Sequence, residues 1–74
     1  MKPEEIAKLQ AYMRKVLKSP TMEVRKRVKK NDSAEVYIGG EFIGVVSRDD
    51  EDGDLSYNFD MAILEFDLDG SAAG

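Results

Sequence analysis

Two adjacent glycines, Gly39 and Gly40, constrain the fold of this chain more than any other feature of its sequence. They separate two stretches, residues 34–38 and 41–48, that are rich in β-branched, aromatic and aliphatic side chains. A two-residue hairpin turn requires positive φ angles, which glycine adopts without steric cost. The glycine pair therefore predicts a tight antiparallel β-hairpin.

The hairpin turn also predicts which residues face each other. The expected pairs are Ile38 with Glu41, Tyr37 with Phe42, Val36 with Ile43 and Ala34 with Val45. One face then carries the aliphatic side chains Ala34, Val36, Ile38, Ile43 and Val45, and the other carries Glu35, Tyr37, Phe42, Gly44 and Val46. We expect the aliphatic face to pack against the core.

Residues 3–18 have the pattern of an amphipathic helix that could cover this face. Its apolar side chains recur every three or four residues: Ile6, Leu9, Met13, Val16 and Leu17, with Tyr12 beside them. Pro3 suits the first helical turn, and Pro20 is expected to stop the helix. The stripe is interpreted as core rather than as a helix that binds a partner.

Residues 22–29 alternate between apolar and charged side chains, which predicts a strand at a sheet edge. With Val28 beside Val36, Lys29 would lie opposite Glu35 and Arg27 opposite Tyr37. These favourable pairs would give the basic strand a structural role.

The C-terminal part continues the sheet. Residues 55–61 alternate clearly, and the phase breaks at Ala62 and Ile63. A bulged strand reaching Leu68 is the first expectation, and a short helix starting at Asp60 is the second. The overall prediction is one α+β domain over residues 1–69, an N-terminal amphipathic helix on one face of an antiparallel meander of four or five strands, with a flexible tail over residues 70–74.

The composition offers little for catalysis or metal binding. The chain has no Cys and no His, which excludes disulfides and the commonest zinc ligand. The acidic turn of residues 49–54 does not fit an EF-hand, because Arg48 stands at the first ligand position and Phe59 where a glutamate is required. Weak divalent binding there stays an alternative to a solvated turn. We expect no enzyme activity, cofactor, catalytic residue or specific metal.

Charge is distributed unevenly along the chain. Residues 1–30 hold ten basic and three acidic side chains, whereas residues 31–74 hold twelve acidic side chains and a single basic one, Arg48. The simplest interpretation is that the two segments neutralise each other in the fold. The alternative is that Arg25, Arg27 and Lys29 bind nucleic acid or another polyanion, although a net charge of −4 opposes this at long range.

The face opposite the expected core offers a second candidate site. Tyr37, Phe42 and Val46 would form an apolar patch there, and such patches often mark interfaces. The alternative is that the C-terminal segment folds over the patch and buries it. The first functional expectation is a small protein-interaction module, acting through this face on another protein or on a second copy of itself.

Two stretches carry a resemblance to a known family. The run from Ala34 to Val45 and the run from Arg48 to Tyr57, together with residues 2–6 and 61–64, are similar to short alphaproteobacterial proteins classed as the domain of unknown function DUF3126. The resemblance covers nearly the whole chain. It implies a bacterial, cytoplasmic protein, and it transfers no functional residues. The sequence itself has no apolar run long enough to span a membrane, so no membrane partner is expected.

Overall fold

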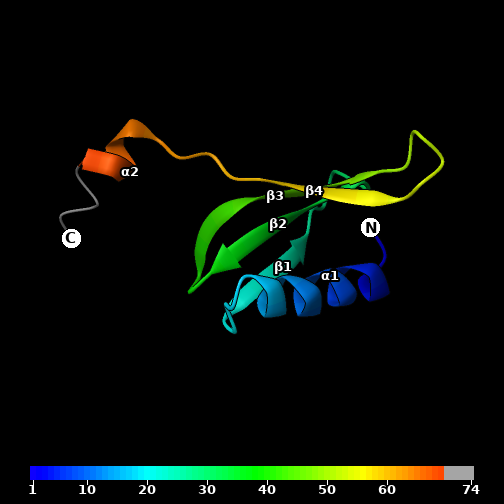
Figure 1. Cartoon of the computed structure of the whole chain (residues 1–74), viewed down its shortest axis with the longest axis horizontal. Helices are drawn as coiled ribbons and strands as arrows, with labels where there is room; N and C mark the ends of the chain where they lie inside the picture. The colour runs from blue at the N-terminus through cyan, green and yellow to red at the C-terminus, as the bar shows by residue number, and fades with distance from the viewer. Residues whose placement is uncertain (70–74) are drawn as a thin grey trace.

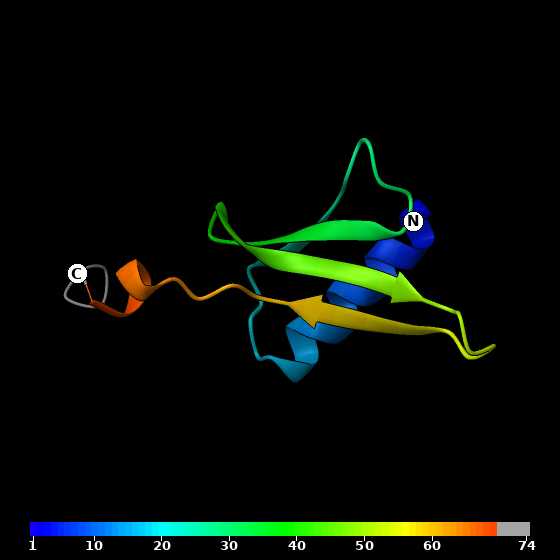
Figure 2. The ribbon, with the colours of Figure 1, turned by 90° about the horizontal axis from the view of Figure 1, so that it is seen from above.

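The computed structural model describes residues 1–69. Its elements in chain order are α1 (Pro3–Val16), β1 (Met22–Lys26), β2 (Ser33–Ile38), β3 (Glu41–Asp49), β4 (Ser56–Asp60) and α2 (Glu65–Asp69). The strands form one antiparallel sheet in the order β1-β2-β3-β4, with α1 along one face (Figures 1 and 2). The expected α+β architecture is confirmed, with four strands. The tail expected over residues 70–74 lies outside the described residues.

The helix α1 ends earlier than the sequence predicts. Its last residue is Val16, because Lys18 adopts a left-handed conformation with a φ of 52°. The N–H of Ser19 then donates to the carbonyl of Arg14 at 3.0 Å, the hydrogen bond of a Schellman-type helix end. Pro20 therefore follows the end of the helix instead of causing it.

The hairpin turn forms as predicted. Gly39 and Gly40 both have positive φ, 60° and 82°, as a type I′ turn requires. Next to the turn, Tyr37 pairs with Phe42 and Ile38 with Glu41. The first two predicted pairs are therefore confirmed.

Beyond these pairs a β-bulge shifts the register of the hairpin. Ile43 has no partner across the ladder, so that Val36 pairs with Gly44 and Ala34 pairs with Val46. The predicted pairing of Val36 with Ile43 and of Ala34 with Val45 is wrong. One extra residue reverses the side-chain alternation that follows it. Val46 consequently points into the core and is 1 % exposed, and it is absent from the outer face where we expected it.

Gly44 lies where β4 comes closest to the bulge. A Cβ atom at this position would lie 2.3 Å from the carbonyl oxygen of Asp60 and 2.9 Å from the ring of Phe59. Real side chains do not tolerate such distances. Gly44 is therefore required for β4 to pair with β3 at this point.

The first strand is shorter than predicted and shifted along its partner. Val24 pairs with Val36, and Arg25 pairs with Glu35. The predicted pairing of Val28 with Val36 is wrong by four residues, an even shift that preserves the two faces. The shift buries Met22 and Val24 in the core, whereas Val28 lies in the following turn and is 96 % exposed.

The core lies between α1 and the first three strands. Its buried apolar side chains are Met1, Met13, Met22, Val24, Ala34, Val36 and Val46, with Ile6, Leu9, Ile38, Ile43 and Tyr57 packed at its margin. α1 packs directly on β1, and the space between helix and sheet widens toward β4 (Figure 1). Within residues 1–69, no helix has both the length and the apolar character needed to span a membrane.

The C-terminal segment does not extend the sheet. β4 ends at Asp60, residues 61–64 are extended without a strand partner, and α2 spans Glu65–Asp69. The predicted bulged strand is wrong, and the alternative helix starts at Glu65 instead of Asp60. The segment points away from the sheet (Figures 1 and 2), and every residue from 61 to 69 is exposed. It therefore does not cover the outer face.

Candidate interaction surface

The outer sheet face is smaller and more polar than the sequence predicts. The rings of Tyr37 and Phe42 meet edge to face, 5.7 Å apart at an angle of 74°. The guanidinium of Arg25 lies 4.0 Å above the Tyr37 ring, and the Tyr37 hydroxyl donates to Glu35 at 2.9 Å. Phe42 is 52 % exposed, while Val46 lies on the opposite face. The expected patch thus loses Val46, and half-buried Val45, which pairs with Glu35, takes its place on this face beside half-buried Tyr37 and exposed Phe42.

The three residues of the predicted polyanion face do not form one free cationic surface. Arg25 forms an ion pair with Glu23 at 2.7 Å. The Nε atom of Arg27 lies 4.0 Å from a carboxylate oxygen of Glu35. Lys29 lies in the turn after β1 and not on the strand. Both arginines therefore have carboxylates within their own sheet as partners.

A larger apolar surface lies on the helix side of the sheet. It is a groove of about 320 Å³ between α1 and β4, which we call the α1–β4 groove. Its lining side chains are Leu9, Tyr12, Met13 and Val16 of α1, Leu17 after it, Val46 of β3, and Tyr57 and Phe59 of β4. Tyr12, Val16 and Leu17 are about half exposed or more.

The groove follows from the unequal spacing of helix and sheet. The apolar stripe of α1 is wider than its contact with β1, so Tyr12 and Val16 extend beyond the core. Phe59 faces the same space from β4, where it pairs with Val46. Sequence reasoning assigned the whole stripe to the core and missed this site. The position of Tyr12 at the margin of the stripe was the available signal.

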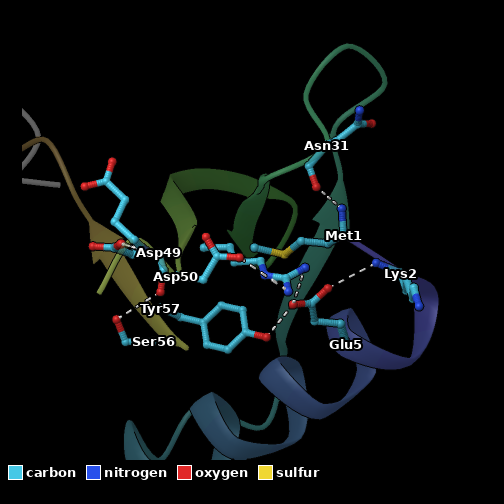
Figure 3. A network of polar contacts seen from close by, with 10 residues as sticks. Met1, Lys2, Glu5, Asn31, Asp49, Asp50, Ser56 and Tyr57 are labelled. Carbon is cyan, nitrogen blue, oxygen red and sulfur yellow. Dashed lines mark hydrogen bonds and ion pairs between the residues drawn. The ribbon is translucent and has the colours of Figure 1, made fainter. Parts of the chain in front are cut away.

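A network of polar contacts joins the helix to the sheet at one end of the groove (Figure 3). The hydroxyl of Tyr57 donates to the carboxylate of Glu5, which also accepts from the main-chain N–H of Lys2 at 3.3 Å. Arg48 lies 3.7 Å from the same carboxylate and 3.8 Å from that of Asp50. These contacts join α1 to β3 and β4, so they hold Tyr57 in place as a wall of the groove.

The network shifts the titration of both of its central groups. The hydrogen bond from Tyr57 lowers the pKa of Glu5, and the Lys2 N–H and the Arg48 charge act in the same direction against the opposing effect of burial. The same hydrogen bond raises the pKa of Tyr57. At neutral pH, Glu5 is therefore held as a carboxylate and Tyr57 as a neutral donor.

The acidic turn of residues 49–54 is organised by its own backbone. The carboxylate of Asp49 accepts from the main-chain N–H of Glu51 at 3.1 Å, and Gly53 has a φ of 87°. Across residues 1–69, no three acidic side chains gather in a metal-ligating arrangement. Weak divalent binding by this turn stays the alternative to a solvated turn.

The protein is a small α+β domain, in which one helix packs on a four-stranded antiparallel meander. An apolar groove lies beside its last strand. The chain belongs to the family described as protein of unknown function (DUF3126), whose model matches residues 5–67. The family resemblance seen in the sequence is thereby confirmed. Neither the curated proteins nor the solved structures contain a match.

Proposed function

We propose that this protein is a non-catalytic interaction module that binds an apolar segment of a protein chain in the α1–β4 groove. The observation that carries the proposal is the exposure of Tyr12 and Val16, 65 % and 52 %, on the walls of a groove. Covering a large apolar side chain contributes roughly 1.5–3 kcal/mol when burial is complete. A partner that fills the groove would therefore gain substantial binding energy.

The site differs from the one that the sequence suggested. The Tyr37–Phe42 face stays a candidate, but Arg25 and Glu35 already satisfy Tyr37 within the sheet. In the groove, by contrast, the walls are apolar, and the polar groups of Glu5 and Tyr57 are paired with each other. Interfaces have an apolar centre with polar groups at the rim, which is the arrangement of the groove.

Polyanion binding ranks second. It would use the basic segment of residues 25–30, in which Lys26, Lys29 and Lys30 are exposed. The ion pair of Arg25 with Glu23 counts against it.

A bacterial, cytoplasmic setting also remains part of the proposal, and its support is the family resemblance alone.

Capture of partners by the tagged chain in its native host tests the proposal. The Val16→Glu variant places a charge on the groove wall and should lose the captured protein, whether that protein is another chain or a second copy. The Phe42→Asp variant on the outer face and the Val28→Glu variant in the exposed turn should retain it. Loss in Phe42→Asp with retention in Val16→Glu would contradict the proposal. Retention of a nucleic acid would favour the second candidate.

A further inference from the structure

The C-terminal arm, residues 61–69, has apolar side chains that the rest of the described chain does not bury. Its five large ones, Met61, Ile63, Leu64, Phe66 and Leu68, are between 53 % and 71 % exposed. The arm lengthens the molecule to 43 Å, against 24 Å in the other two directions. The radius of gyration of 13.6 Å correspondingly exceeds the roughly 11 Å of a compact domain of this length. The arm thus resembles one half of an interface.

The direction in which the arm leaves the domain makes it unfavourable for the arm to fold back into the α1–β4 groove of its own chain. It continues the course of β4 away from the sheet (Figures 1 and 2), whereas its own groove lies behind the end of β4. To enter that groove the chain would have to reverse directly after Asp60. Residues 61–64, which directly follow Asp60, contain no Gly, Pro, Asn, Asp or Ser, the residues that favour sharp reversals. A groove on another copy requires no such reversal.

The arm and the groove complement each other in charge. The stretch from residue 60 to residue 69 holds four acidic side chains and no basic one. On α1, Lys8 precedes Tyr12 by four residues and Lys15 follows it by three, so both lie on its side of the helix. Lys8 borders the adjoining hollow that Leu9, Tyr12 and Tyr57 line. The acidic side chain there, Glu5, is already paired with Tyr57 and Arg48. The helix side of the groove therefore offers lysines to an acidic, apolar segment.

We propose that the chain forms a two-fold symmetric dimer in which each C-terminal arm lies in the α1–β4 groove of the other copy. This inference rests on the proposed function and names the partner of the same site. Two arms bring ten large apolar side chains to the interface. Neighbouring positions of an extended segment face opposite ways, and Phe66 and Leu68 lie on different sides of α2, so about half of these side chains can face a groove. At roughly 60–120 Å² each, they bury on the order of 500 Å², and the groove walls and the main chain of the arms add their own area. A stable interface needs about 1,200–2,000 Å² in total.

Sedimentation equilibrium of two complementary variants of the full chain tests this arrangement. Val16→Glu places a charge in the groove and leaves the arm unchanged. Phe66→Glu places a charge on the arm and leaves the groove unchanged. Each variant alone should have a dimer dissociation constant at least tenfold higher than the unchanged chain. An equimolar mixture retains one intact arm and one intact groove in the mixed dimer. It should therefore recover association to a level between the single variants and the unchanged chain.

Controls and contrary outcomes separate this inference from the proposed function. Val28→Glu and Phe42→Asp should dimerise like the unchanged chain, and circular dichroism should show the same fold in every variant. An unchanged chain that stays monomeric, or single variants that stay dimeric, would overturn the inference. So would a mixture that associates no better than either variant. If host capture still depends on Val16 in any of these cases, the groove binds another protein and the proposed function stands.

Discussion

The hydroxyl of Tyr57 donates a hydrogen bond to the carboxylate of Glu5, joining the last strand of the sheet to the first turn of α1 across 52 positions of the chain. The contact holds β4 beside the helix without closing the space between them. The groove thus depends on a hydrogen bond at one end and on apolar walls along its length.

Removal of this hydroxyl should weaken the fold measurably. Tyr57→Phe should lower the free energy of unfolding by about 1–3 kcal/mol, since a hydrogen bond to a charged acceptor is lost. Urea denaturation monitored by circular dichroism measures this change. Tyr12→Phe is the matched control, because the Tyr12 hydroxyl bonds to no residue among those described and its ring is 65 % exposed. Equal effects of the two substitutions would contradict the assigned role of Tyr57.

Stability should fall in acid because of Glu5. The pKa of Glu5 is lowered in the folded chain from its ordinary value of 4.5, chiefly by the hydrogen bond from Tyr57. This stabilisation is fully present above pH 4.5 and is lost as the pH falls through the lowered pKa. Glu5→Gln should therefore flatten the acid limb of a stability profile between about pH 2 and 6. Glu4→Gln, in the same turn, should leave the limb steep.

Stability should also fall at alkaline pH, because of Tyr57. The pKa of Tyr57 is raised above 10.0, so the stability from its neutral form is present below pH 10.0 and lost as the pH rises through the raised pKa. Tyr37, bonded to Glu35, shifts in the same direction. Spectrophotometric titration should show one phenol fewer with a raised pKa in Tyr57→Phe than in the unchanged chain. A Tyr57 phenol that titrates at its ordinary pKa of 10.0 would refute the hydrogen bond to Glu5.

A side chain at Gly44 should displace β4. Gly44→Ala would bring a methyl group within 2.3 Å of the Asp60 carbonyl, and overpacking of this kind costs about 1–3 kcal/mol. In NMR spectra, amide shifts should change around Phe59. Gly39→Ala, strained by a φ of 60°, should destabilise the hairpin turn without moving those signals. A neutral effect of Gly44→Ala would show that β4 is not closely fitted to the bulge.

The helix end offers a stabilising substitution. Lys18 has a φ of 52°, which costs a residue with a Cβ atom about 1 kcal/mol, so Lys18→Gly should raise the melting temperature. Lys15→Gly, inside the last turn of α1, should lower it. A fall in both variants would rule out the Schellman-type end.

Local signals in the sequence predicted the fold, and contacts between distant segments decided the site. The requirement for positive φ at Gly39 and Gly40 is local, so the turn and the adjoining Tyr37–Phe42 pair were predictable. The bulge at Ile43 inserts one residue into β3 next to the point where β4 passes close to Gly44, and the periodicity of the sequence does not report it. That bulge puts Val46 in the core and Val45 on the outer face, the reverse of the prediction, and so changes the composition of the predicted patch.

Beyond the marginal position of Tyr12, the groove could not be predicted from the sequence, for a related reason. An apolar stripe on a helix shows that the helix packs, but not how much of the stripe is covered. The coverage depends on the distance between α1 and β4, set by Tyr57 and Glu5 across the whole chain. The C-terminal segment was ambiguous between strand and helix because its apolar pattern breaks phase at Ala62.

Site-specific photo-cross-linking in the native host tests the central claim, that the groove is the binding surface, most directly. A benzoylphenylalanine at position 12 in the groove should form a covalent adduct with a protein chain, and the adduct should disappear when Val16→Glu is added. The same group at position 42 on the outer face should give none. Adducts from position 42 alone, or from neither position, would contradict the account.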